Sequence, residues 1–279
     1  MTLQLPSSTI GVFDSGIGGL SVLAALRAEL PAHDFVYAAD SAHSPYGERD
    51  TAYVLERSRK LVNWLYQQRI SILVLACNTA TAAAIEQLRA EFPQLPMVGV
   101  EPALKPACLV SKTGHVGVLA TRSTLASRRF QALLAAQVGS AHFTLQACDG
   151  LADAIEQSAI SGDTTQTLAL CQKYTSMMGT FGDHDEAIDT LVLGCTHYPF
   201  VSDQLQQLLG SGVQLLSNGA AVARQARRLL TASMPTSSQA ETTSKLGNIR
   251  LVSTGQAQTL QAAANRWLGL EAVVEVLAI

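Results

Sequence analysis

The segment LVLACNTAT (residues 73–81) returns 118 positions later as LVLGCTHYP (residues 191–199). Both copies begin with a short apolar run, which is typical of a buried strand in a parallel sheet. Both then continue with a cysteine, Cys77 or Cys195, followed by hydroxyl, amide or imidazole groups. We therefore predict that the two cysteines lie at the ends of equivalent strands and face each other across one small substrate.

Strand patterns and helix patterns alternate along much of the chain. Amphipathic helix patterns at 19–30, 53–69 and 81–92 separate several apolar runs. This alternation predicts an α/β fold with doubly wound parallel sheets, which bind ligands at the carboxyl ends of their strands. The Ser/Thr-rich segment 231–248 predicts a mobile surface loop. The predicted strands cover residues 9–14, 34–40, 71–76, 97–100, 115–120, 190–194, 213–217 and 249–255.

A second, weaker repeat links IGVFDSGIGGL (10–20) to VGVLATRSTL (116–125), at an offset of 106 residues. Because this offset is close to 118, we predict two similar halves, although any doubly wound protein repeats strand–turn–helix units. The predicted first domain comprises residues 1–98 and 212–279, and the second comprises residues 99–211. The segment VGVEPALKPA (98–107) is the predicted crossing between them.

Composition excludes several classes of function. The net charge is −3 and the few Lys/Arg pairs form no basic field, so we expect no nucleic-acid partner. No apolar run reaches membrane-spanning length and the first residues lack a signal-peptide pattern, so we expect a cytoplasmic protein without a membrane partner. Five cysteines without a C-x-x-C pair argue against disulfides and a zinc ribbon, and we interpret Cys108, Cys148 and Cys171 as small buried hydrophobes.

The turn DSGIGG (14–19) follows a predicted strand and precedes a predicted helix. Its glycines would let backbone N–H groups approach an anion at the helix N-terminus. The spacing differs from G-x-G-x-x-G and the P-loop lysine is absent, so a carboxylate fits better than a phosphate. The turn SPYG (44–47) presents either a tyrosine and amides to a ligand or only a chain reversal.

Two thiols at equivalent positions indicate proton transfer. One thiol can remove a proton from a carbon acid while the other delivers a proton to the opposite face, because an ordinary thiol pKa of about 8.5 permits both roles. Asp14 and His197 are the nearest assisting groups by motif. A single cysteine nucleophile beside His197, as in thiol hydrolases, is the alternative, but it leaves the second cysteine unexplained.

Six segments together resemble the glutamate racemases of the cofactor-independent aspartate/glutamate racemase superfamily: FDSGIGGLSVL, DSAHSPYGERD, LVLACNTATAAAI, VGVEPALKPA, GVLATRSTL and LVLGCTHYPF. The resemblance implies two pseudo-symmetric α/β domains with the active site in the cleft between them. It also implies interconversion of L- and D-glutamate without pyridoxal phosphate, other cofactor or metal, and supply of D-glutamate for peptidoglycan in the cell wall.

By motif, the resemblance implies that Cys77 and Cys195 are the acid/base thiols and that Asp14 and His197 assist them. The residues that it implies for binding the substrate are Asp14, Ser15, Tyr46, Gly47, Asn78, Thr79, Thr121 and Thr196. The chain departs from the family at LAD (151–153), where Asp153 stands in place of a Glu expected beside His197. It also departs at SNGAA (217–221), where the family often has DSGAA.

Rival functions remain open at this stage. One is racemisation of another acidic amino acid such as aspartate, which needs a smaller pocket. Another is a non-catalytic binding protein, because some racemase relatives bind proteins such as DNA gyrase. The expected partners are the substrate glutamate and, as one option, a second copy of the chain in a homodimer.

Overall fold

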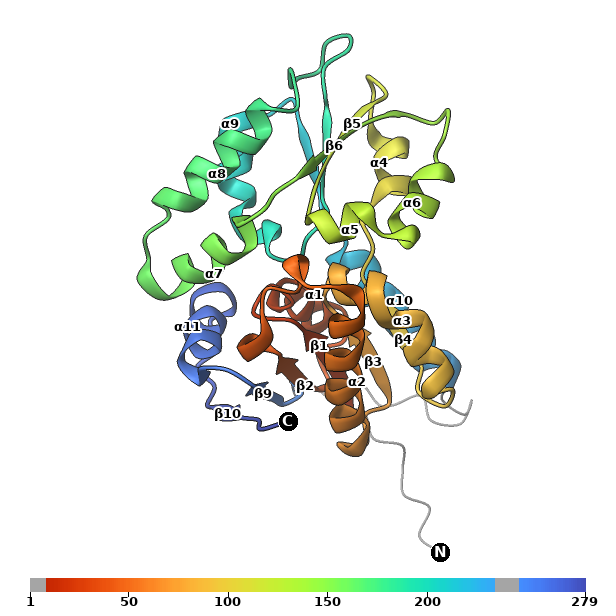
Figure 1. Cartoon of the computed structure of the whole chain (residues 1–279), viewed down its shortest axis with the longest axis vertical. Helices are drawn as coiled ribbons and strands as arrows, with labels where there is room; N and C mark the ends of the chain where they lie inside the picture. Colours follow the sequence, from red (N-terminus) through yellow and green to blue (C-terminus); the bar gives the residue numbers. More distant parts are fainter. Residues whose placement is uncertain (1–8, 234–245) are drawn as a thin grey trace, which may run out of the picture.

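The computed structural model describes residues 9–233 and 246–279, which form two parallel sheets, one in the lower and one in the upper part of the molecule (Figure 1). The first sheet has the order β10-β9-β2-β1-β3-β4. Its strands are β1 (Thr9–Asp14), β2 (Asp34–Ala39), β3 (Ile72–Leu75), β4 (Met97–Gly99), β9 (Ile249–Ser253) and β10 (Val274–Val276). The second sheet has the order β6-β5-β7-β8. Its strands are β5 (His115–Ala120), β6 (His142–Ala147), β7 (Thr190–Leu193) and β8 (Gln214–Leu216).

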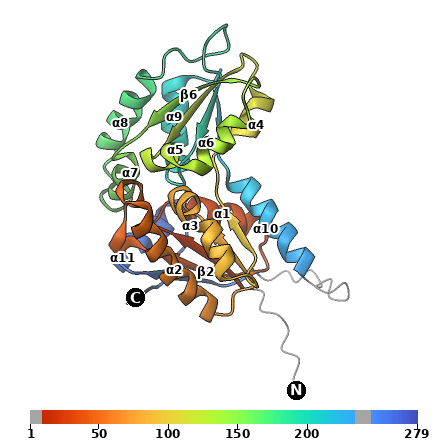
Figure 2. The same ribbon diagram turned by 45° about the vertical axis from the view of Figure 1, so that its right-hand side comes forward.

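Helices cover both sheets, and we call each sheet with its helices a domain (Figure 2). The helices of the first domain are α1 (Leu20–Glu29), α2 (Thr51–Gln67), α3 (Asn78–Glu91), α10 (Gly219–Ser233) and α11 (Ala257–Leu268), with short 3₁₀ helices η1 (Ser41–His43) and η2 (Tyr46–Glu48). Those of the second domain are α4 (Leu104–Val110), α5 (Arg122–Ala126), α6 (Arg128–Ala135), α7 (Leu151–Ser161), α8 (Thr165–Ser176), α9 (Ser202–Leu209) and the 3₁₀ helix η3 (Tyr198–Val201). The α/β architecture with parallel sheets in two domains is confirmed.

The internal repeat is visible in the strand pairing. The order β2-β1-β3-β4 in the first sheet has the same pattern as β6-β5-β7-β8 in the second. Phe13 of β1 lies opposite Leu75 of β3, and Leu119 of β5 lies opposite Leu193 of β7. These pairs reproduce the offsets of 106 and 118 residues found in the sequence. Each cysteine, Cys77 or Cys195, therefore stands two residues beyond the equivalent strand of its sheet.

The chain passes between the domains twice. The first passage lies between β4 and α4, and the second lies between β8 and α10, which packs on α1 in the first domain. The two passages contact each other, because the Asn218 side-chain amide donates to the Glu101 carbonyl oxygen at 2.9 Å. Strand β8 pairs with β7, so residues 214–216 join the second sheet, although we predicted them in the first domain. Sheet membership depends on the pairing neighbour, which the local pattern does not reveal.

Some predicted elements need correction. Strands β6 and β10 were not predicted. Strand β6 is only partly buried and carries polar residues along its length, and β10 has only three residues, of which two are exposed. Of the loop predicted at 231–248, residues 234–245 lie outside the described part of the chain, and residues 231–233 end α10. Within residues 9–233 and 246–279, every helix is too short or too polar to cross a bilayer.

Candidate active site

A pocket of about 620 Å³, part of it open to solvent, lies where the carboxyl ends of the two sheets meet. Ten of the eleven residues predicted to act on or bind the substrate line it: Ser15, Tyr46, Gly47, Cys77, Asn78, Thr79, Thr121, Cys195, Thr196 and His197. Asp14, the eleventh, is fully buried behind the lining residues. The fold thus brings together groups from β1, β3, β5 and β7 in one place.

Cys77 caps the N-terminus of α3. Its Sγ accepts a hydrogen bond from the Ala80 amide at 3.4 Å and lies 3.4 Å from Ser15 Oγ. Helix α3 begins at Asn78, whereas we predicted a polar turn there and a helix from residue 81. A helix N-terminus normally lowers a thiol pKa. Here burial, reinforced by the Asp14 carboxyl, raises the pKa of Cys77 to about 12, so this sulfur holds its proton at neutral pH.

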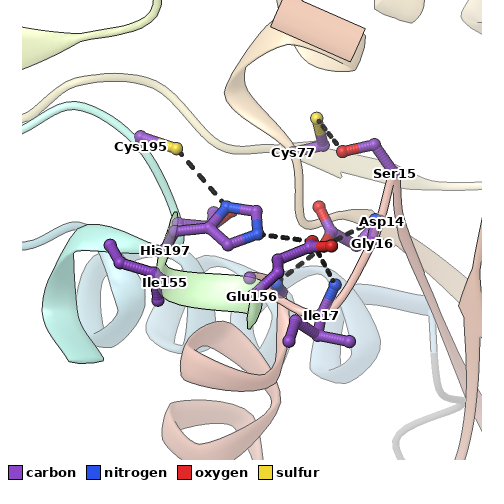
Figure 3. A network of polar contacts seen from close by, with 12 residues as sticks. Asp14, Ser15, Gly16, Ile17, Cys77, Ile155, Glu156, Cys195 and His197 are labelled. Atoms are coloured by element: carbon purple, nitrogen blue, oxygen red, sulfur yellow. Dashed lines mark hydrogen bonds and ion pairs between the residues drawn. The ribbon is translucent and has the colours of Figure 1, made fainter. Parts of the chain in front are cut away.

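Cys195 has a different neighbourhood, because its Sγ lies 3.6 Å from His197 Nδ1. His197 Nε2 lies 2.7 Å from Glu156 Oε1, and the Ile17 amide of the first domain donates to the same oxygen at 3.1 Å (Figure 3). Burial lowers the pKa of His197, but hydrogen bonds and charge from Cys195 and Glu156 outweigh it and raise that pKa well above its ordinary value. Burial raises the pKa of Glu156, but the hydrogen bond to His197 and its charge outweigh burial, so the pKa of Glu156 lies below its ordinary value. The two side chains therefore form a charged pair beside Cys195.

Asp14 is held by the turn that follows β1. Its Oδ2 accepts from the amides of Gly16 at 3.1 Å and Gly19 at 2.9 Å, while Oδ1 has no partner within the described residues. Burial raises the pKa of Asp14 against the opposing effect of His197. Since these two amides bind Asp14 and that of Ile17 binds Glu156, the prediction that the turn offers its amides to a ligand is wrong for these three groups.

The acid beside His197 is Glu156, although the departure at 151–153 had drawn attention to Asp153. Asp153 lines the pocket but is exposed and accepts a hydrogen bond from Gln157 at 2.8 Å. Glu156 stands three residues later, on the same face of α7. The sequence signal for Glu156 was therefore present in LADAIE (151–156), one helical turn beyond the expected position.

The first-domain wall of the pocket is rigidly supported. The buried Tyr46 hydroxyl donates to Asp40 Oδ2 at 2.5 Å, and Asp40 in turn pairs with Arg57 at 2.8 Å. This network holds η2, which contains Gly47. A Cβ atom at Gly47 would lie 3.2 Å from Thr121 Cβ, so the two domains approach each other closely here.

Hydroxyl and amide groups complete the lining. Thr79 Oγ1 of the first domain lies 3.2 Å from Thr121 Oγ1 of the second. The Asn78 side chain donates to the Val100 carbonyl oxygen at 3.4 Å, and its buried Oδ1 has no partner among the residues described. That oxygen is available to accept from an ammonium group, and the hydroxyls can donate to a carboxylate.

Sequence reasoning missed several lining residues. They include Glu48, Arg122, Cys148 and Asp149. Cys148 is buried as predicted, but it also reaches the pocket because it follows β6, a strand that was not predicted. Arg122 pairs with Asp149 at the pocket and directly follows Thr121, so its position was within reach of the motif. In the described ranges, no three His, Cys, Asp or Glu side chains are grouped as a metal site.

Comparison with known proteins defines the class. The model of the Asp/Glu/Hydantoin racemase family matches residues 10–226, and the chain belongs to this family of isomerases. It is 45% identical to the glutamate racemase of Ectopseudomonas mendocina over 268 residues, which cover 96% of this chain and 97% of that protein.

Solved structures agree with this family assignment. The crystal structure of a glutamate racemase isoform from Bacillus anthracis superposes with a TM-score of 0.83 at 30% identity and covers 99% of both chains. That of Escherichia coli glutamate racemase, in complex with L-glutamate and the activator UDP-MurNAc-Ala, has a TM-score of 0.83 at 31% identity. It covers 98% of this chain and 100% of the E. coli chain.

Proposed function

We propose that this protein interconverts L- and D-glutamate by two-base proton transfer, with Cys77 and Cys195 acting on opposite faces of the α-carbon. The observation that carries the proposal is the position of these thiols at equivalent ends of β3 and β7, against one pocket. A thiolate removes the α-proton, and the C–H electron pair passes into a carbanion stabilised by the adjacent carboxyl group. The opposite thiol then gives its proton to carbon and becomes the thiolate.

The surroundings suit the two sulfurs to different starting roles. Burial and Asp14 keep Cys77 protonated, so it is ready to donate. A charged His197 lies 3.6 Å from the Cys195 sulfur, and this contact favours the proton-accepting role for Cys195. The reverse reaction uses the same groups with exchanged protonation states.

The substrate assignment rests on the relatives and on the lining. The E. coli relative is described with L-glutamate bound, which favours glutamate over aspartate. The hydroxyls of Thr79 and Thr121 and the open Asn78 Oδ1 supply donors and an acceptor for carboxylate and ammonium groups. By resemblance, the D-glutamate formed would supply peptidoglycan synthesis in the cell wall.

Racemisation in D₂O tests the mechanism directly. Starting from unlabelled L-glutamate, the first D-glutamate formed should carry deuterium at the α-carbon, while remaining L-glutamate stays almost unlabelled. Mass spectrometry of the separated enantiomers at low conversion gives the answer. Protium in early D-glutamate would show that one base serves both faces. Faster turnover of L-aspartate than of L-glutamate in a parallel assay would identify aspartate as the substrate instead.

Cysteine variants supply the matched controls. We expect Cys77→Ser and Cys195→Ser each to lose at least about tenfold in rate, equivalent to about 1.4 kcal/mol of barrier, because serine is a much weaker acid. Cys171→Ser should retain activity, since Cys171 is buried in the second-domain core and does not line the pocket. Full activity in either pocket variant would contradict the two-thiol mechanism.

A further inference from the structure

Gly16 and Gly18, in the turn after β1, lie directly against side chains of the second domain. A Cβ atom on Gly18 would lie 2.3 Å from His197 Nδ1 and 2.5 Å from His197 Cε1. A Cβ atom on Gly16 would lie 2.1 Å from Glu156 Oε1. Real Cβ contacts essentially never fall below 3.0 Å. Neither glycine has a φ in the left-handed region, so space rather than backbone conformation demands glycine here.

The same turn and the first residues of α1 are also hydrogen-bonded to the second domain. The Ile17 amide donates to Glu156 Oε1 at 3.1 Å, and Ser21 Oγ donates to the Thr196 carbonyl oxygen at 2.7 Å. Glu156 belongs to α7 and pairs with His197, and Thr196 directly follows Cys195 in the chain. The first domain thus contacts groups that surround Cys195.

Gly19 shows that this relationship is particular to the other two glycines. A Cβ atom there would meet Asp14 Cβ at 2.7 Å and Ala76 Cβ at 3.0 Å, both in its own domain. Gly19 therefore serves packing inside the first domain, whereas Gly16 and Gly18 serve the junction between domains.

We propose that Gly16 and Gly18 are positioning residues whose missing side chains let the first domain dock against Glu156 and His197, so that His197 is held toward Cys195. The inference rests on the proposed function, in which Cys195 is one of two reactive thiols. Docking assembles the chain Ile17–Glu156–His197–Cys195 from both domains. The thiol of the second domain is thereby prepared only when the first domain is in contact.

Each glycine leaves room for a different side chain in this series of contacts, Gly18 for His197 and Gly16 for Glu156. A methyl group at position 18 would displace the imidazole at Nδ1, the atom that faces Cys195. A methyl group at position 16 would displace the Glu156 carboxylate from His197 Nε2. Gly18→Ala should therefore act on Cys195 directly, and Gly16→Ala should act through His197.

The test measures thiol reactivity, which does not depend on racemisation. Cys77 and Cys195 are alkylated with iodoacetamide between pH 6 and 10 in the wild type, Gly16→Ala and Gly18→Ala, and peptide mass spectrometry gives each rate. The titratable groups that can influence the pH profiles are Asp14 and Glu156 around His197. Around Cys195 they are His197, Cys77, Cys148 and Tyr198. Gly212→Ala is the control, because a Cβ atom there lies no closer than 3.6 Å to a neighbour.

We expect Cys195 to be alkylated about tenfold more slowly at pH 7 in Gly18→Ala than in the wild type, because the added methyl group displaces the His197 imidazole from the sulfur. The Cys77 profile should stay unchanged. Faster alkylation of both cysteines would indicate loss of the fold and would contradict a positioning role, as would an unchanged Cys195 profile.

A second background separates positioning from general damage. In His197→Asn, adding Gly18→Ala should change the Cys195 profile no further, because the displaced group is already absent. An equal additional shift in that background would overturn the proposal. If the profiles behave as expected but the wild type does not racemise glutamate, the positioning role stands and the proposed function fails.

Discussion

Phe200 and Trp267 stack across the boundary between the domains, with ring centroids 3.7 Å apart and planes inclined by 8°. Phe200 belongs to η3, which begins directly after His197, and Trp267 belongs to α11 of the first domain. A second contact lies beside the stack, where Arg266 Nη1 donates to the Ser158 carbonyl oxygen of α7 at 3.0 Å. The C-terminal helix α11 therefore supports both segments that carry the His197–Glu156 pair.

A double-mutant cycle should detect this stack. Phe200→Ala, Trp267→Ala and the combined variant are compared with the wild type by urea denaturation. Stacked aromatic pairs contribute about 0.5–1.5 kcal/mol beyond their burial. The unfolding free energy lost by the double variant should therefore be smaller than the sum of the two single losses by that amount. Simple addition of the single effects would mean that the stack contributes nothing specific.

Glu156 rather than Asp153 should be the carboxylate on which activity depends. Glu156→Gln keeps the size of the side chain but removes the charge that pairs with His197, so we expect at least about a tenfold loss in kcat, about 1.4 kcal/mol of barrier. Asp153→Asn is the matched control, because the Asp153 carboxylate accepts a hydrogen bond from Gln157 on the same helix, whereas His197 pairs with Glu156. Polarimetry of both variants decides, and equal losses would contradict the assignment.

The buried ion pair Asp40–Arg57 should contribute more to the free energy of unfolding than an exposed ion pair does. The side chains of Arg57 and Asp40 are 5% and 0% exposed, so Arg57→Met leaves a buried carboxylate without its cationic partner and should cost about 3–5 kcal/mol of unfolding free energy. Arg59→Met breaks an exposed pair with Glu91 and should cost about 0–1 kcal/mol. Urea denaturation of both variants measures the difference, which would vanish if the buried pair were dispensable.

The raised pKa of His197 makes stability depend on pH. The folded protein keeps a proton that the unfolded chain releases above the ordinary histidine value of 6.5, so the folded state binds more protons above that pH. The stabilisation is full below about pH 6.5 and is lost as pH rises through the folded-state pKa. We expect the wild type to lose stability between pH 6.5 and 9 relative to a His197→Asn/Glu156→Gln variant.

The double variant is the right reference for that comparison. Removing His197 alone would leave the buried Glu156 without its cation, and its own titration would then alter the profile. Glu156 is paired in the wild type with a lowered pKa, so it contributes no slope in this range. A constant difference between the two proteins from pH 6.5 to 9 would refute the expectation.

The sequence by itself determined the features that depend on neighbouring residues along the chain. Apolar runs mark β3 and β7, and the cysteine that follows each run must lie at the carboxyl edge of a parallel sheet. The offsets of 106 and 118 residues recur in the pairing of Phe13 with Leu75 and of Leu119 with Leu193. Strand position and pocket location were therefore predictable.

Only the tertiary structure decided which groups prepare each thiol. Glu156 is 41 residues from His197 and 139 from Ile17, and a local pattern contains no information on contacts across such separations. A glycine motif indicates that space is needed but does not identify the neighbour, and the structure places Glu156 next to Gly16 and His197 next to Gly18. Burial, which raises the pKa of Cys77 to about 12, is likewise a property of packing between domains and helices rather than of the residues beside it in the chain.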